Sequence, residues 1–387
     1  MPAGFPLGAT ITVQQLDRDP HPALAQLRER EPVSWLPSLD GWLVTRHDLA
    51  LAAMRDSHTF TVDDPRFSTG QVIGPSMLSL DGDEHARHRT PFVGPFRPRE
   101  VKQRFAELAR AEAESLVDAL EPPGAGELRR GFAGPMSARI VTRALGLKRD
   151  EVQDVLAWYD AIVASVTAIT AGRGRSDAGD RAFAELRTRL QSVIATGESS
   201  SLLAAAASGS GLTTDQVVSN AAVLLFGGIE TTEGMIANAA LMLLQRPDEL
   251  TAARDGAAAL EAAIEESLRL EPAAAVIDRY ATADVELGAA RIRRGDLVRI
   301  SITGANRDPA VFPAPDEFDP RRERRGNLAF AQGPHVCVGV HLARLEAREA
   351  LAVLLGRLPA LRLAPGRAAE IRGLVFRKPP RLDAVWG

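Results

Sequence analysis

The only cysteine among the 387 residues, Cys337, lies in a loop rich in glycine. Gly333, Pro334 and Gly339 make the approach a tight loop, and a helix of roughly four turns is predicted from about Val340. A thiol at a helix N-terminus ionises more readily, because the helix dipole and the unpaired backbone N–H groups stabilise the thiolate. Glycines beside the sulfur have no Cβ atoms, so a flat ligand can approach it closely.

A single cysteine limits the chemistry that this loop can perform. Most lone cysteines are small buried side chains with no chemical role. A zinc site needs several cysteine or histidine ligands and a disulfide needs a second cysteine. The chemical roles that remain are a nucleophile, which would need a histidine general base beside it, and an axial ligand to haem iron.

The pattern Phe-x-x-Gly-x-His-x-Cys-x-Gly, from Phe330 to Gly339, is specific. It resembles the haem-ligand loop of the cytochrome P-450 family. The resemblance implies that Cys337 is the proximal thiolate ligand of haem b, that Phe330 packs beside the sulfur, and that His335 reaches a haem propionate. Gly339 closes the same haem-binding pattern. Ala331 departs from it, because the family often has glycine at this place.

A second specific stretch lies inside a predicted helix of some thirty residues that begins with a capping box of Thr213 and Gln216. Its centre is apolar on all sides, so we expect this helix to be buried. Gly227 and Gly228 interrupt the helical composition, and each costs about 1 kcal/mol relative to alanine. Glu230 and Thr231 then place a carboxylate and a hydroxyl at the end of the buried run, where a charge is unfavourable unless it is paired or functional.

This Gly-Gly-x-Glu-Thr stretch has two interpretations. A helix kink with satisfied polar groups would explain it structurally. It also resembles the distal-helix motif of the same family, which implies that the helix opens beside the iron. By that resemblance, Glu230 and Thr231 deliver protons to bound dioxygen. Local violations of helix rules are expected at functional sites.

Cationic side chains occur at two further places. His85 and Arg89 lie four residues apart on one face of a predicted helix, and Arg279 lies in a predicted strand. Each would ordinarily be a solvated surface charge. The family resemblance implies that all three bind haem propionates, and an arginine can hold a carboxylate through two hydrogen bonds.

The Glu-x-x-Arg pattern of Glu266 and Arg269 is weak by itself, because residues three apart on a helix commonly form a surface ion pair. Its position between the distal helix and the cysteine loop matches a structural motif of the family. The resemblance implies a tie to a downstream arginine, for which Arg322 is preferred and Arg321 is the alternative.

The elements that must position these residues are mainly helical. We expect the cytochrome P-450 fold, mainly α with a small β portion, as a single haem-thiolate domain over residues 1–387. The periodicity predicts long helices and a strand-rich segment. The predicted helices include 98–120, 132–147, 150–171 and 180–206, short strands fall within 278–301, and residues 361–363 and 370–376 are expected to form a closing hairpin.

Composition excludes several classes of function. The net charge of −4 and the pI of about 6.0 give no electrostatic footprint for nucleic acid or an anionic membrane. The N-terminus does not resemble a signal peptide, and no apolar run approaches the ~20 residues of a membrane span. A lone cysteine fits a reducing cytoplasm. We therefore expect a cytoplasmic, monomeric protein, and its alanine- and arginine-rich composition indicates a bacterial source.

The function implied by the resemblance is that of a haem-thiolate monooxygenase, which inserts one oxygen atom of dioxygen into an apolar small molecule. A peroxygenase or isomerase, a haem-binding sensor or carrier, and a cysteine hydrolase are the rival classes. The substrate pocket is expected where the family turns small or hydrophobic side chains toward its substrate. These residues are Val223, Phe226, Gly227, Ala274, Ala275, Val375 and Phe376.

An electron donor is also implied. The sequence has no Gly-x-Gly-x-x-Gly fingerprint after a strand, so electrons must come from a separate protein, a ferredoxin or a flavodoxin. Such acidic donors would be steered by a positive patch on the cysteine side of the haem. The basic residues expected to form it are Arg97, Arg99, Lys102, Arg104, Arg344 and Arg348.

Overall fold

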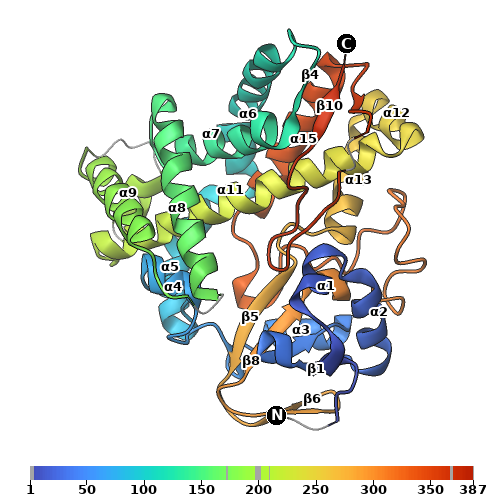
Figure 1. Cartoon of the computed structure of the whole chain (residues 1–387). Helices are drawn as coiled ribbons and strands as arrows, with labels where there is room; N and C mark the ends of the chain where they lie inside the picture. The colour runs from blue at the N-terminus through green and yellow to red at the C-terminus, as the bar shows by residue number, and fades with distance from the viewer. Residues whose placement is uncertain (1–3, 171–172, 197–201, 209, 367–368, 387) are drawn as a thin grey trace.

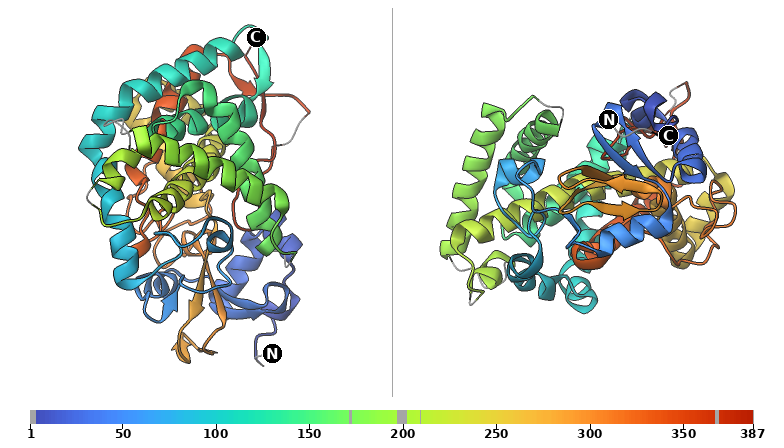
Figure 2. Two further views of the ribbon diagram at one scale, coloured as in Figure 1. Left: turned by 90° about the vertical axis from the view of Figure 1, so that its left-hand side faces the viewer. Right: turned by 90° about the horizontal axis from the view of Figure 1, so that it is seen from below.

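The computed structural model describes residues 4–170, 173–196, 202–208, 210–366 and 369–386. Within them, most helices gather at one end of the molecule and the largest sheet lies at the other (Figure 1). The two turned views in Figure 2 show the same division. The mainly α architecture with a small β portion is confirmed.

Fifteen α-helices occur within the described residues. The helix predicted over 98–120 is present, whereas the one predicted over 180–206 is represented by two helices, and residues 197–201 between them lie outside the described ranges. The helices are α1 Val13–Arg18, α2 His21–Arg30, α3 His47–Arg55, α4 Ser68–Ile73, α5 Gly82–Val93, α6 Pro98–Leu120, α7 Gly134–Ala144, α8 Val152–Thr170, α9 Asp177–Thr196, α10 Leu202–Ala207, α11 Thr214–Leu244, α12 Pro247–Asp255, α13 Ala257–Leu270, α14 Ile302–Ala305 and α15 Val340–Arg357.

The largest sheet has five strands in the order β1-β2-β8-β5-β3. Its pairs are antiparallel except β2 with β8, which run parallel. Alanines of α3 and α14 pack on it in a separate apolar cluster. The strands are β1 Val33–Leu36, β2 Gly41–Val44, β3 Phe60–Thr61, β4 Ala125–Glu127, β5 Val276–Ala281, β6 Val285–Leu287, β7 Ala290–Ile292, β8 Leu297–Ser301, β9 Arg362–Leu363 and β10 Asp383–Val385.

The closing hairpin expected between 361–363 and 370–376 is wrong. β9 pairs with β10, and β10 also pairs with β4. The segment 370–378 instead folds back on itself, with a bridge between Arg372 and Lys378. Gly373 permits this turn: its φ is +120°, and a Cβ atom there would collide with the carbonyl oxygen of Phe376.

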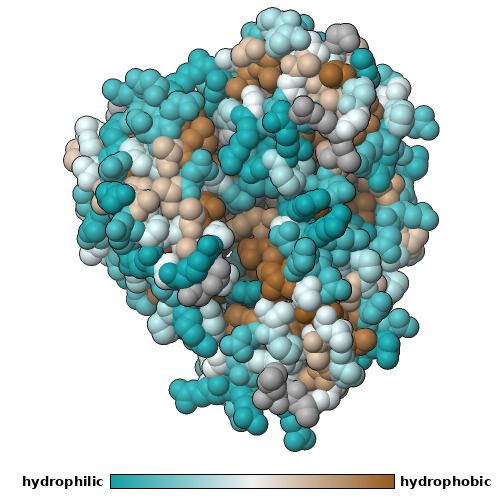
Figure 3. Space-filling view, in the orientation of Figure 1, coloured by the Kyte–Doolittle hydropathy of each residue, from teal (hydrophilic) through white to brown (hydrophobic). Residues whose placement is uncertain are grey.

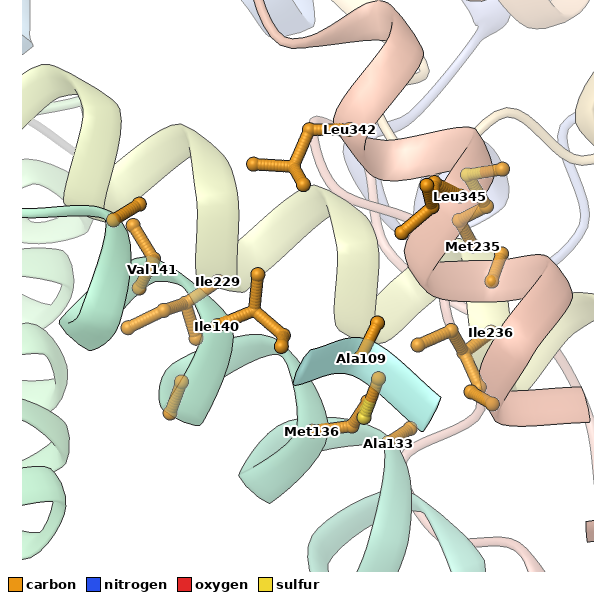
Figure 4. Packing of buried hydrophobic residues seen from close by; sticks show 14 of the residues in the cluster. Ala109, Ala133, Met136, Ile140, Val141, Ile229, Met235, Ile236, Leu342 and Leu345 are labelled. Atoms are coloured by element: carbon orange, nitrogen blue, oxygen red, sulfur yellow. The ribbon is translucent and has the colours of Figure 1, made fainter. Parts of the chain in front are cut away.

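α11 runs through the middle of the molecule (Figure 1) and its burial was predicted from its apolar centre. Figure 4 shows Ile229 of α11 between the α7 side chains and Leu342 of α15. Gly228 allows close approach of α7, since a Cβ atom there would lie 3.0 Å from Val141 Cγ2. The predicted capping box of Thr213 and Gln216 begins the helix.

One described helical stretch, Arg149–Thr170, is long and apolar enough to cross a membrane by length and composition, contrary to the expectation from the sequence. One third of its most apolar window is buried in the protein, where α8 packs against α9 and α7. A core helix passes the same test, so this feature is weak support for a membrane span.

A buried ion network joins the two ends of the chain. Glu271, at the end of α13, lies 2.5 Å from His21 Nε2, 3.2 Å from Arg307 Nη2 and 3.0 Å from Arg377 Nε. Burial alone would raise the pKa of Glu271, but the hydrogen bond from His21 and the two arginine charges lower it to about 2. This stabilisation is therefore complete above pH 4.5 and is lost as the pH falls toward about 2.

Glu271→Gln should lower the free energy of unfolding at pH 7 by about 3 kcal/mol, because it leaves buried arginines without their carboxylate. Urea titration followed by circular dichroism measures this change. Glu286→Gln is the matched control, since the Glu286–Arg291 pair is exposed and should contribute less than about 1 kcal/mol. Equal losses of unfolding free energy in Glu271→Gln and Glu286→Gln would contradict the stabilising role of the buried Glu271 network.

Candidate active site

The cysteine loop is held against α3 by close backbone packing. Gly333 has a φ of +76°, and a Cβ atom there would lie 2.6 Å from the carbonyl oxygen of Met54. The Cys337 N–H donates to the carbonyl of Phe330 at 2.9 Å. Ala331 has a φ of +57°, in the left-handed region that favours glycine. The position where the family often has glycine is therefore one where alanine is strained.

The Cys337 thiol is accessible in the protein alone, yet burial by surrounding atoms raises its pKa. The backbone N–H of Gly339 and the charge of Arg89 oppose this rise without overcoming it. The backbone N–H groups at the helix N-terminus thus favour the thiolate, as expected from the sequence, but burial opposes them. A metal ion bound to the sulfur would favour the thiolate form of Cys337, because a coordinating thiol loses its proton.

Gly339 leaves room beside the sulfur. Its φ of −86° is available to any residue, so its backbone does not require glycine. A Cβ atom there would lie 4.0 Å from Cys337 Sγ and would meet no other atom of the described residues beyond its chain neighbours within that distance. Space for a flat ligand over the sulfur is the physical consequence.

Four cationic or basic side chains surround the cysteine loop. The rings of His85 and His335 lie 4.3 Å apart, and Arg89 donates to the carbonyl of Val336 at 2.5 Å. Arg279 is almost fully buried on β5. Buried His85 Nε2 and Arg279 Nε have no hydrogen-bond partner among the described residues.

Too little negative charge surrounds these basic side chains. Burial, together with the nearby cations, lowers the pKa of His85 to about 4. Burial lowers the pKa of Arg279 to about 10, although Asp81 opposes it. Asp81 is already engaged, since it lies 2.7 Å from His335 Nε2 and accepts from Thr61. A bound dicarboxylate would complete the missing hydrogen bonds, so the residues present fit the propionates of haem.

α11 presents one accessible stripe in its otherwise buried central part. Val223, Gly227 and Thr231, spaced four apart, are all partly accessible. A Cβ atom on Gly227 would meet nothing within 4 Å, so the helix borders open space there. The helix is unbroken at this point, and the Thr231 hydroxyl donates to the Gly227 carbonyl at 2.6 Å. The expected opening of the helix is not present.

Glu230 and Thr231 are neighbours in sequence but do not bond to each other. Glu230 Oε1 lies 2.7 Å from the ammonium nitrogen of Lys378. The same ammonium lies 2.5 Å from Glu233 Oε2. Both members of the predicted proton pair are therefore already engaged, one with the helix backbone and one with an ion pair.

Five of the predicted pocket residues meet at the C-terminal segment. The rings of Phe226 and Phe376 are in edge contact with centroids 5.6 Å apart. Ala274 bridges to Phe376, and the Ala275 N–H donates to the Val375 carbonyl at 2.8 Å. Figure 3 shows apolar side chains in a hollow near the middle of one face.

The Glu-x-x-Arg residues form a buried cluster. Arg269 donates to both oxygens of Glu266 at 2.9 and 2.7 Å, and Arg322 Nε lies 3.3 Å from Glu266 Oε1. Arg321 is exposed and pairs with Glu249. The geometry therefore favours Arg322 over Arg321 as the downstream partner.

The expected basic patch is only partly available. Arg344 forms a bidentate pair with Glu265, and Arg348 pairs with Glu261 and Glu349. The other basic residues of the patch lie at or near the start of α6 and are exposed. They are Arg97, Arg99, Lys102 and Arg104.

Sequence reasoning missed two residues that contact the predicted site. Asp81 precedes α5, and its only sequence signal was that of a helix N-cap. Lys378 belongs to no motif and lies about 150 residues beyond the helix that it contacts, so no local pattern could have identified it.

Comparisons with known proteins agree with this geometry. The family model for cytochrome P450 matches residues 257–363. Nocardicin C N-oxygenase of Nocardia uniformis subsp. tsuyamanensis is 34% identical over 99% of this chain and 98% of its own. The cytochrome P450 monooxygenase PikC of Streptomyces venezuelae is 33% identical, over 96% and 92%. The structure of P450BioI in complex with an acyl carrier protein bearing hexadec-9Z-enoic acid has a TM-score of 0.87 at 27% identity, over 97% and 100%.

The fold and the similarity over nearly the whole chain define a haem-thiolate oxidoreductase. The chain belongs to the cytochrome P450 family. The family binds haem through a cysteine thiolate, and its related members named here incorporate oxygen as monooxygenases. The class predicted from the sequence is confirmed.

Arg279→Gln should speed haem loss by about tenfold, because one charged hydrogen bond to a propionate contributes about 1.5–3 kcal/mol. Transfer of haem to an excess of apomyoglobin, followed in the visible spectrum, gives the rate. Arg291→Gln removes an exposed charge from β7 and serves as the control. An unchanged rate in Arg279→Gln would exclude this residue from propionate binding.

Proposed function

We propose that Cys337 is the axial ligand of haem b in a bacterial, cytoplasmic and monomeric monooxygenase formed by the whole chain, 1–387. The observation that carries the proposal is the pair of buried nitrogen atoms near the one cysteine, His85 Nε2 and Arg279 Nε, that have no hydrogen-bond partner among the described residues. Bound haem would supply the activation of dioxygen, which an electron-rich thiolate favours. The haem would lie between the cysteine loop and the accessible stripe of α11.

The chain's own residues have distinct tasks in this proposal. His85, Arg89, Arg279 and His335 hold the propionates, and Gly339 leaves room over the sulfur. Phe330 covers the sulfur, and its own ring is covered by the guanidinium of Arg344 at 4.7 Å. These contacts would fix the direction of the sulfur when haem is bound.

Proton handling requires one change from the arrangement described. The Thr231 hydroxyl must leave the Gly227 carbonyl to orient a water molecule, which the open space beside Gly227 permits. The Glu230 carboxylate, held by Lys378, would relay to that water a proton that it receives from solvent. We propose that this acid and hydroxyl pass protons toward the haem side of α11.

The substrate is proposed to be an apolar small molecule. Support comes from the contacts among Phe226, Ala274, Val375 and Phe376, with Val223, Gly227 and Ala275 completing the lining. Such a pocket binds by apolar burial. The structural relative P450BioI was solved with an acyl carrier protein, but no feature here assigns such a partner to this chain.

We propose that a ferredoxin or flavodoxin supplies electrons at the cysteine side. Since Arg344 and Arg348 are paired with glutamates, the exposed Arg97, Arg99 and Lys102 beside the start of α6 would contribute most of the attraction. Association should weaken as salt screens it.

Cys337→Ser tests the central proposal. The reduced protein with carbon monoxide should lose the red-shifted Soret band that a thiolate ligand produces, because serine oxygen does not replace the electron-rich sulfur. A variant that kept this band would exclude Cys337 as the ligand. Wild-type turnover with peroxide alone, at the rate seen with dioxygen and reductant, would favour a peroxygenase.

Thr231→Ala should bind haem and substrate normally but release peroxide in place of product, with coupling lower by about tenfold, a modest share of what proton transfer contributes. Reductant consumption, peroxide and product are measured together. Thr232→Ala, one position along α11, is the control, since Thr232 is buried away from the accessible stripe. Unchanged coupling in Thr231→Ala would refute the role.

A further inference from the structure

Lys378 connects the C-terminal segment to the carboxylates of α11. Its side chain is nine-tenths buried, and its ammonium contacts Glu230 at 2.7 Å and Glu233 at 2.5 Å. Glu233 has a second cation, Arg129, at 3.1 Å. Among the described residues, Lys378 is the only cation that forms an ion pair with Glu230.

The contact belongs to a longer seam on one face of α11. Phe226 contacts Phe376, and Asn238 donates to the Arg377 carbonyl at 3.0 Å. At Gly234, a Cβ atom would lie 2.8 Å from the Ala273 Cβ, so α11 packs very closely there. Residues at this spacing share a helix face. Apolar packing and backbone hydrogen bonds therefore dock the segment without any need for a buried lysine.

A buried lysine is an unfavourable choice for docking alone. Desolvation of a buried ion pair can exceed its attraction, and an apolar side chain often stabilises as well. Without Lys378, the carboxylates of Glu230 and Glu233 would lie one helical turn apart with only Arg129 and Arg130, both on Glu233, to compensate them. The Glu230 side chain would then be displaced, because two buried like charges repel.

We propose that Lys378 is a positioning residue, whose charge holds the carboxylate of Glu230 in place beside Thr231. This inference rests on the proposed function, in which Glu230 supplies protons. Lys378 lies two positions after Phe376 in the C-terminal segment that lines the pocket. It would join Glu230 and Thr231 as a residue that couples oxygen use to product formation.

The test compares single variants in the haem-loaded protein. Lys378→Met should lower coupling of reductant to product by about tenfold, whereas Lys378→Arg should retain most of it because the positive charge remains. Arg129→Met is the matched control: it removes a cation from the same network and a hydrogen bond to the Pro380 carbonyl, but leaves the Glu230 contact. Its coupling should be close to wild type.

A double variant separates action through Glu230 from any other effect. In a Glu230→Gln background, Lys378→Met should cause no further loss of coupling. An equal loss in both backgrounds would overturn the proposal. Equal losses in Lys378→Met and Arg129→Met would also overturn it, since the lysine would then only tie the segment to α11.

Two readouts do not depend on turnover. The C–O stretching frequency of the reduced carbon monoxide complex should shift in Lys378→Met and not in Arg129→Met, because only the first disturbs the charge beside Thr231. Substrate affinity from the spin-state titration should be unchanged. If wild type lacks the thiolate-type Soret band, the proposed function fails; if the band is present and Lys378→Met is fully coupled, this inference alone fails.

Discussion

The arrangement of the molecule depends on buried polar groups beside the cysteine loop that the described residues leave without hydrogen-bond partners. His85 and Arg279 come from α5 and β5, which are far apart in sequence, and both retain donors without acceptors. Leaving buried donors unpaired is costly. A bound dianionic ligand would remove this free-energy cost by accepting the missing hydrogen bonds. The same ligand would then connect the helical end and the sheet-rich end of the protein.

α11 imposes the second constraint, since it must be both core helix and wall of a site. Packing from α7, α13, α15 and α9 buries most of its side chains, and Figure 4 shows part of the contact with α7 and α15. Small residues and one threonine remain where no other element covers it. The unbroken helix also shows that Gly227-Gly228 need not produce a kink. Here one glycine opens space and the other admits a neighbouring helix.

Much of this could be predicted from the sequence, because the informative signals were local. The cysteine loop, the capping box of α11 and the strands β6, β7 and β8 follow from spacing and turn residues. The C-terminal segment could not be predicted in the same way. Its conformation is set by Gly373 and by charges on distant helices, so the expected hairpin was wrong and Lys378 was overlooked.

The contact between the chain's ends has a consequence for biosynthesis. The carbonyl of Asp17 accepts from the Gly373 N–H and from Arg377, across 360 residues of sequence in the second case. The segment that lines the pocket therefore meets Asp17 only after the intervening 360 residues have been translated. Until then the earlier elements have an uncovered apolar wall, which exposes them to aggregation.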